Sequence, residues 1–105
     1  MTKQQAIRKS IAHWKRMVRW AKKQDPLSIT EPTLMAHQLG EIWFCRDCPL
    51  CRKYQSCTDC PLKSCGRGSA WGKVRRGSRT WGTWVQAAEQ HMLPALEELL
   101  EGKTK

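Results

Sequence analysis

All six cysteines of this chain lie between Cys45 and Cys65, and their spacing restricts the fold more than any other feature. The spacing is C-x2-C-x2-C-x5-C-x2-C-x4-C. Because a C-x-x-C turn directs two sulfurs toward one point, repeated turns of this kind are typical of a shared metal centre. The same stretch offers few large apolar side chains, and each ordered residue loses about 1–2 kcal/mol of backbone entropy. We therefore expect residues 45–65 to fold around a metal ion or around covalent cross-links.

Zinc is the metal that this arrangement favours. Cys-Pro-Leu occurs at residues 48–50 and again at 60–62, and two facing C-x-x-C turns would close one tetrahedral site. The predicted ligands are Cys48, Cys51, Cys57 and Cys60, with Cys65 and Cys45 as substitutes.

Two other kinds of centre stay open. The first three cysteines match the C-x-x-C-x-x-C run of bacterial ferredoxins, and a proline follows the fifth, so an iron–sulfur cluster is the main alternative. Disulfides are the second alternative. Residues 1–24 lack the apolar run of a secretory signal, so we expect a reducing cytoplasm, which favours metal over disulfides.

Charge is distributed unevenly along the chain. The net charge is +10 at pH 7, and residues 1–24 and 63–80 contain cations but no acid. Such asymmetry predicts a basic surface for a polyanionic partner. No run of about 18 apolar residues occurs, so we expect no membrane span. The predicted partner-binding residues are Arg8, Lys15, Arg16, Arg19, Lys22, Lys23, Arg67, Trp71, Lys73, Arg75, Arg76 and Arg79.

Apolar residues three and four apart predict the helices. One stripe predicts an amphipathic helix over residues 2–24, which ends at the Asp-Pro pair that follows it. Another predicts a helix over residues 80–101, kinked near Pro94. A shorter helix is expected over residues 33–43, and the basic Gly/Ser/Trp segment 66–79 is expected to be an irregular connector.

These elements predict one mainly α domain over residues 1–105. The two long helices each need to bury an apolar stripe, and the short helix cannot cover both. We therefore expect an antiparallel pair of long helices, closed at one end by the short helix and by the cysteine-rich module at 45–65.

Four sequence motifs together resemble small cysteine-rich proteins of tailed bacteriophages and prophages. They are Ser10-Ile-Ala-His-Trp14, the Cys-Pro-Leu-Cys segment at 48–51, the Cys-x-x-Cys-Pro segment at 57–61, and Thr-Trp-x-x-Trp at 80–84. The resemblance implies a phage origin and the cytoplasm of a host cell. It implies no settled activity, although by analogy small phage proteins often bind nucleic-acid machinery during host takeover.

The sequence contains no nucleophile–base pair, phosphate-binding glycine loop or acidic pair of an enzyme, so we expect a non-catalytic protein. The first hypothesis is a small basic, zinc-stabilised accessory protein that binds nucleic acid or a nucleoprotein complex. One alternative is an inhibitor or adaptor that binds an acidic surface of a host enzyme or defence complex. Another is an iron–sulfur or thiol redox protein.

Overall fold

The computed structural model of the chain describes residues 2–43, 49, 53 and 70–101, apart from the side chains of residues 70–72 and 101. The regular elements of this part are all helical, which confirms a mainly α fold. They are α1 (Lys3–Ala21), α2 (Pro32–Leu39), α4 (Ala70–Arg76), α5 (Trp81–Ala87), η2 (Ala88–Met92) and α6 (Leu93–Glu101).

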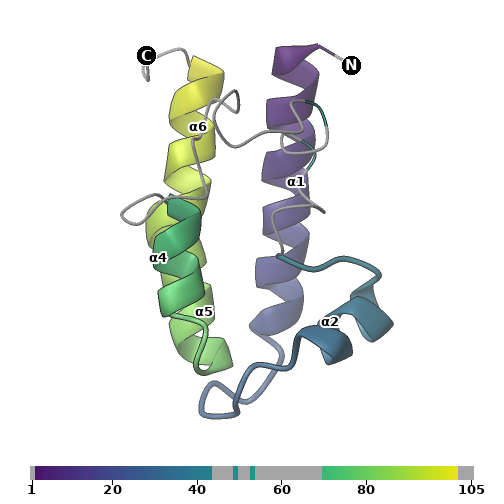
Figure 1. The fold of residues 1–105 in the computed structure, drawn as a ribbon, viewed down its shortest axis with the longest axis vertical. Coiled ribbons are helices and arrows are strands. Elements are labelled where there is room, and N and C mark those ends of the chain that lie inside the picture. Colours follow the sequence, from purple (N-terminus) through teal and green to yellow (C-terminus); the bar gives the residue numbers. More distant parts are fainter. Residues whose placement is uncertain (1, 44–48, 50–52, 54–69, 102–105) are drawn as a thin grey trace.

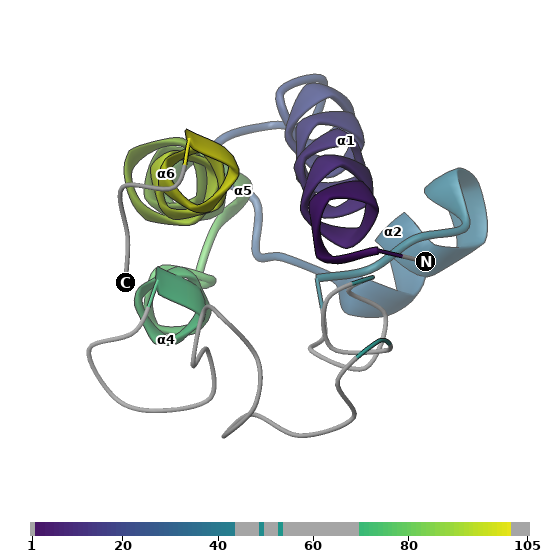
Figure 2. The same ribbon diagram turned by 90° about the horizontal axis from the view of Figure 1, so that it is seen from above.

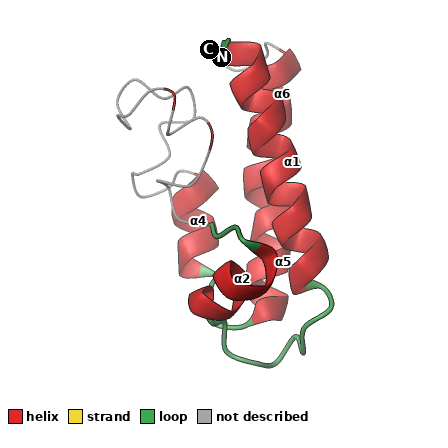
Figure 3. Ribbon diagram, turned by 90° about the vertical axis from the view of Figure 1, so that its right-hand side faces the viewer, coloured by secondary structure: helices red, strands yellow, loops and turns green. Residues whose placement is uncertain are grey.

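Two long helical columns form the body of the molecule (Figure 1). The first is α1, and the second is α5, η2 and α6 in unbroken succession. They run antiparallel, so the start of α1 and the end of α6 lie at the same end of the pair. This is the arrangement expected from the two apolar stripes. α2 packs beside α1 at the other end (Figure 3), and α4 packs against α5 and η2.

Local sequence signals set the helix boundaries. Thr2 starts α1 with a capping box, in which its hydroxyl accepts from the backbone of Gln5 and its own N–H donates to the Gln5 side chain. Thr80 starts α5 in the same way. The short helix was expected to reach residue 43 but ends at Leu39, because Gly40 adopts a left-handed φ of 77°.

The expected kink near Pro94 takes the form of a π-helical turn. Proline lacks the N–H that would bond the carbonyl four residues earlier, so the hydrogen-bond ladder must shift nearby. The shift occurs in η2, directly before Pro94, where the Leu93 N–H donates to the Ala88 carbonyl five residues back. The column therefore stays helical, and Pro94 lies on its exposed side.

Part of the predicted connector at 66–79 is a helix rather than an irregular segment. Residues 70–76 form α4, and its Val74 is completely buried. Gly77 ends this helix close to α5, where an added Cβ would lie 3.1 Å from the Ala87 Cβ. The glycine content of the segment weakens intrinsic helix propensity, but packing against α5 and η2 outweighs it.

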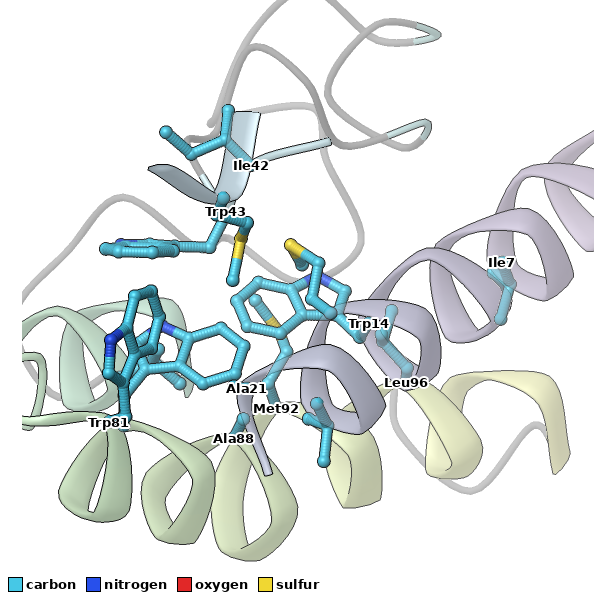
Figure 4. Close-up of a cluster of buried hydrophobic side chains, with 14 of the residues drawn as sticks. Ile7, Trp14, Ala21, Ile42, Trp43, Trp81, Ala88, Met92 and Leu96 are labelled. Carbon is cyan, nitrogen blue, oxygen red and sulfur yellow. The ribbon is translucent and has the colours of Figure 1, made fainter. Parts of the chain in front are cut away.

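Tryptophans form the centre of the core (Figure 4). Trp14 of α1 and Trp84 of α5 stack with ring centroids 5.9 Å apart, and both are buried. Trp43 packs on Trp84 and edge-on against Trp81, with centroid distances of 5.4 and 6.0 Å. Trp20 closes the cluster, with its ring 5.0 Å from that of Trp81. Aromatic packing therefore joins α1, α5 and the segment after α2.

The loop between α1 and α2 is bonded to the start of α5. The N–H of Trp81 donates to Ser28 O at 3.1 Å, and the N–H of Gly82 donates to Pro26 O at 3.0 Å. A Cβ at Gly82 would lie 3.0 Å from both the Cβ and the carbonyl oxygen of Pro26. Only glycine permits this approach without movement of the loop.

Candidate functional site

The six cysteines predicted to bind metal, Cys45, Cys48, Cys51, Cys57, Cys60 and Cys65, all lie outside the described residues. Among the residues that are described, no three His, Cys, Asp or Glu side chains come together as a metal site. The metal centre and its ligands therefore stay a prediction from the sequence. Pro49 and Lys53 are the described residues within this module.

The outward face of α1 is the best-defined part of the predicted partner surface. Arg8, Lys15, Arg19 and Lys23 are exposed, and no acidic side chain of the described chain pairs with them. Lys22 behaves differently, because its Nζ lies 3.0 Å from Glu89 Oε2 of η2. Since both partners are exposed, this ion pair stabilises the fold little and leaves Lys22 accessible. From Arg8 to Lys23 the face thus carries exposed cations that no described acid neutralises, apart from Lys22.

A shallow groove of about 220 Å³ runs along the edge of this face. Trp20 lies in it partly exposed, and the indole Nε1 donates to Gln38 Oε1 at 3.1 Å. A groove that combines cations with an aromatic edge suits a nucleic-acid strand, whose phosphates need charge and whose bases stack. Its lining residues are Arg16, Arg19, Trp20, Lys23 and Leu39.

The remaining predicted cations lie elsewhere in the molecule. Lys73, Arg75 and Arg76 are exposed on α4, and Arg79 is exposed just after it. α1 and α4 occupy diagonal corners of the bundle when it is seen along its axis (Figure 2), so the two groups of cations come from separate helices that are not neighbours in this view. Neither Arg67 nor the side chain of Trp71 falls within the described structure.

A partly buried cluster that the sequence did not predict joins α1 to the segment after α2. Glu41 Oε2 accepts from Arg16 Nε at 2.7 Å, and Glu41 Oε1 accepts from the Arg16 terminal nitrogen. The same Oε1 lies 3.1 Å from His13 Nδ1. Because two hydrogen bonds hold Arg16 to Glu41, this predicted partner-binding cation is restrained in its position.

The charge state of this cluster follows from its contacts. The hydrogen bond from Arg16 lowers the pKa of Glu41, and the contact with His13 lowers it further, while burial opposes both. The same hydrogen bond raises the pKa of Arg16. Glu41 is therefore ionised at neutral pH and can only accept hydrogen bonds, so His13 Nδ1 carries the proton that it donates.

His13 is one of the two buried polar residues of the described core, with its side chain only 4% exposed. Its second nitrogen, Nε2, is inaccessible to solvent and makes no hydrogen bond within the described structure. The sequence contains only a slight indication that His13, Arg16 and Glu41 form a cluster. His13 and Arg16 are three residues apart on a predicted helix, and Glu41 is the one acid between residues 32 and 46.

An open cavity of about 590 Å³ lies beside this cluster. Its walls come from α1, from the end of α2 and from Pro49 of the cysteine-rich segment. The lining residues are Lys9, Ala12, His13, Arg16, Ala36, Gly40, Glu41, Ile42 and Pro49. The cavity thus has the His13–Glu41 pair and Pro49 in its lining.

No helix of the described chain has the length and apolar character needed to cross a lipid bilayer. Comparison with protein-family models, with curated proteins and with solved structures found no match to this chain.

Proposed function

We propose that this chain is a non-catalytic, zinc-stabilised accessory protein that binds nucleic acid, alone or in a nucleoprotein complex, through the outward face of α1. The observation that carries the proposal is the row of exposed, unneutralised cations on α1 beside the groove at Trp20. Phosphates are neutralised by such side chains with release of counterions, which provides affinity without dependence on sequence.

In this proposal the metal organises the fold and does no chemistry. Zinc held by protein thiolates is a closed site without an open position for substrate. Structural zinc supplies about 10–16 kcal/mol of apparent binding free energy at neutral pH, which offsets a large part of the entropy lost when the apolar-poor segment 45–65 becomes ordered. The resemblance of the motifs to phage proteins supports a setting in the cytoplasm of a bacterial host.

Salt dependence tests the proposal directly. If α1 contacts about six phosphates, affinity for duplex DNA or RNA should fall about 10³-fold between about 50 and 200 mM salt. Fluorescence anisotropy with labelled single-stranded and duplex oligonucleotides measures this, at matched pH and with zinc-loaded protein. Absence of binding at micromolar protein in both buffers would reject the nucleic-acid function.

One observation favours a second candidate, an inhibitor or adaptor that binds an acidic protein surface. Leu27 and Ile29 are 84% and 75% exposed at the end of the bundle where α1 meets its loop. Two neighbouring apolar side chains beside a cationic helix would anchor a protein interface. If this candidate is right, the wild type should co-purify with one host protein and should not bind oligonucleotides. The double variant Leu27→Ser, Ile29→Ser should no longer co-purify with that protein and should not bind oligonucleotides either.

A further inference from the structure

Trp20 differs from the other tryptophans whose side chains the structure describes, because it alone is not buried. Its ring lies in the wall of the groove of about 220 Å³ at the edge of the α1 face. It meets Trp81 edge to face, with ring centroids 5.0 Å apart and planes at 82°. Such a pair covers at most one face of either ring, so Trp81 leaves at least one face of the Trp20 indole uncovered.

A hydrogen bond from α2 fixes the orientation of this indole. Because Trp20 Nε1 can only donate, the carbonyl oxygen of the Gln38 side chain faces it, at 3.1 Å. The ring is thus held between Trp81 and Gln38 before any ligand arrives. A side chain that is already held in place loses little conformational freedom when a ligand packs on it, which favours binding.

Cations share the groove with the indole. Arg16, Trp20 and Lys23 are four and three residues apart, so they lie on one face of α1, and Arg19 lines the same groove. Arg19 and Lys23 are exposed and pair with no acid of the described chain. A ligand that matches this groove therefore carries negative charge together with a flat aromatic surface.

A nucleic-acid strand has both properties, but its two forms offer them differently. In a duplex the bases cover one another's faces, and only their edges reach the grooves. In a single strand a base can be splayed out and stacked on an aromatic side chain. We propose that the groove at Trp20 binds single-stranded nucleic acid, with one base stacked on the indole and neighbouring phosphates on Arg19 and Lys23. This inference rests on the nucleic-acid binding proposed above and names the form of nucleic acid that the site selects.

Three labelled oligonucleotides of equal length test the inference on the wild-type protein by fluorescence anisotropy. They are a single strand of about 12 nucleotides, an abasic strand with the same phosphates and no bases, and the duplex of the first strand with its complement. The intact strand should bind about 5- to 150-fold more tightly than the abasic strand, since stacking of one base is lost. It should also bind more tightly than the duplex, although the duplex carries twice as many phosphates per unit length.

The possible failures of the two proposals are distinguishable. Equal affinity for the intact and abasic strands, or tighter binding of the duplex, would overturn the stacking on Trp20 and leave the binding of phosphates by α1 in place. Absence of binding to all three oligonucleotides at micromolar protein would overturn both proposals.

Three variants then assign the preference to the indole. Trp20→Leu should bring the affinity ratio between intact and abasic strands close to one, whereas Trp20→Phe, which keeps an aromatic ring, should retain most of it. Lys23→Gln is the matched control, because it should weaken binding of both strands about equally and leave the ratio unchanged. Each ratio compares two ligands on one protein, so a partly unfolded fraction cancels. A wild-type ratio in Trp20→Leu would overturn the inference.

Discussion

At the scale of single residues, Glu41 links two parts of the chain that the sequence leaves far apart. Its carboxylate accepts from Arg16 and His13 of α1, although it lies 25 and 28 residues away from them. Its side chain is 22% exposed, so water screens these contacts less than it would on the surface. A charged hydrogen bond of this kind stabilises the folded state more than an exposed ion pair does.

This contact predicts a specific pH dependence of stability. The pKa of Glu41 is lower in the folded protein than its ordinary value of 4.5, so the unfolded chain binds more protons and stability rises with pH. The stability that this contact adds is fully present at pH values above the pKa of Glu41 in the unfolded chain. It is lost as the pH falls through the pKa of Glu41 in the folded protein. Glu41→Gln should therefore cost about 1–3 kcal/mol of unfolding free energy at neutral pH.

Chemical denaturation at several pH values between about 7 and 3 checks this expectation, because the difference between wild type and Glu41→Gln should shrink as the carboxylate becomes protonated. Glu31→Gln serves as control, since Glu31 is exposed and precedes α2. A difference that stays constant over the whole range would mean that Glu41 stabilises the fold by packing and not by its charge.

At the scale of the elements, the start of α5 depends on a contact that ordinary helix propensity would not predict. Alanine is normally better than glycine in a helix by roughly 0.5–1 kcal/mol. At Gly82, however, the added Cβ would lie 3.0 Å from the carbonyl oxygen of Pro26. We expect Gly82→Ala to destabilise the protein by about 1–3 kcal/mol, because the loop must move away from α5.

Denaturant unfolding followed by circular dichroism measures this change. Gln86→Ala is the control, because Gln86 is exposed on the same helix and its replacement should change the unfolding free energy little. Stabilisation by Gly82→Ala would show that the loop after α1 moves freely relative to α5.

Periodicity predicted the long helices because their burial follows from residues three and four apart. Trp14, Trp84 and Leu96 lie on those stripes and are buried. The burial of Trp43 and the pairing of Glu41 could not be predicted in this way. Both residues follow the left-handed turn at Gly40, and their positions depend on the direction that the chain takes after this turn. α4 was not predicted because it contains Gly72 and follows a glycine-rich stretch, which lowers its intrinsic helix propensity, and packing against α5 and η2 stabilises it.

At the scale of the whole molecule, removal of the metal should affect the helices as well as the cysteine-rich segment. The tryptophan core is formed by α1, α5 and the segment after α2. In the sequence, the cysteines come after that segment and before α4. We expect protein purified under reducing conditions to be colourless and to carry about one zinc per chain. A chelator should lower helicity and stability, because metal binding contributes to folding.

Metal analysis, the absorption spectrum and circular dichroism with and without chelator test this expectation. A brown protein with a broad visible band would identify an iron–sulfur cluster and favour the redox alternative. Protein without metal and without free thiols would identify disulfides.

The basic face of α1 carries the last prediction, because its cations can be changed without disturbing the core. Lys15, Arg19 and Lys23 are exposed and pair with no acid of the described chain. Reversing all three to glutamate should therefore leave the thermal midpoint nearly unchanged. Binding to duplex should weaken for every sequence, and the salt slope should fall by about 0.9 for each phosphate that the protein no longer neutralises.

A matched variant separates this surface from net charge. Reversal of Lys73, Arg76 and Arg79 to glutamate changes the charge of the molecule by the same amount, but on α4 and in the turn that follows it. Anisotropy titrations at two salt concentrations should show the larger drop in affinity for the α1 variant, because only α1 pairs its cations with the groove at Trp20. Equal drops would mean that long-range attraction to the whole protein accounts for binding, since attraction of that kind depends on net charge rather than on which cations are present.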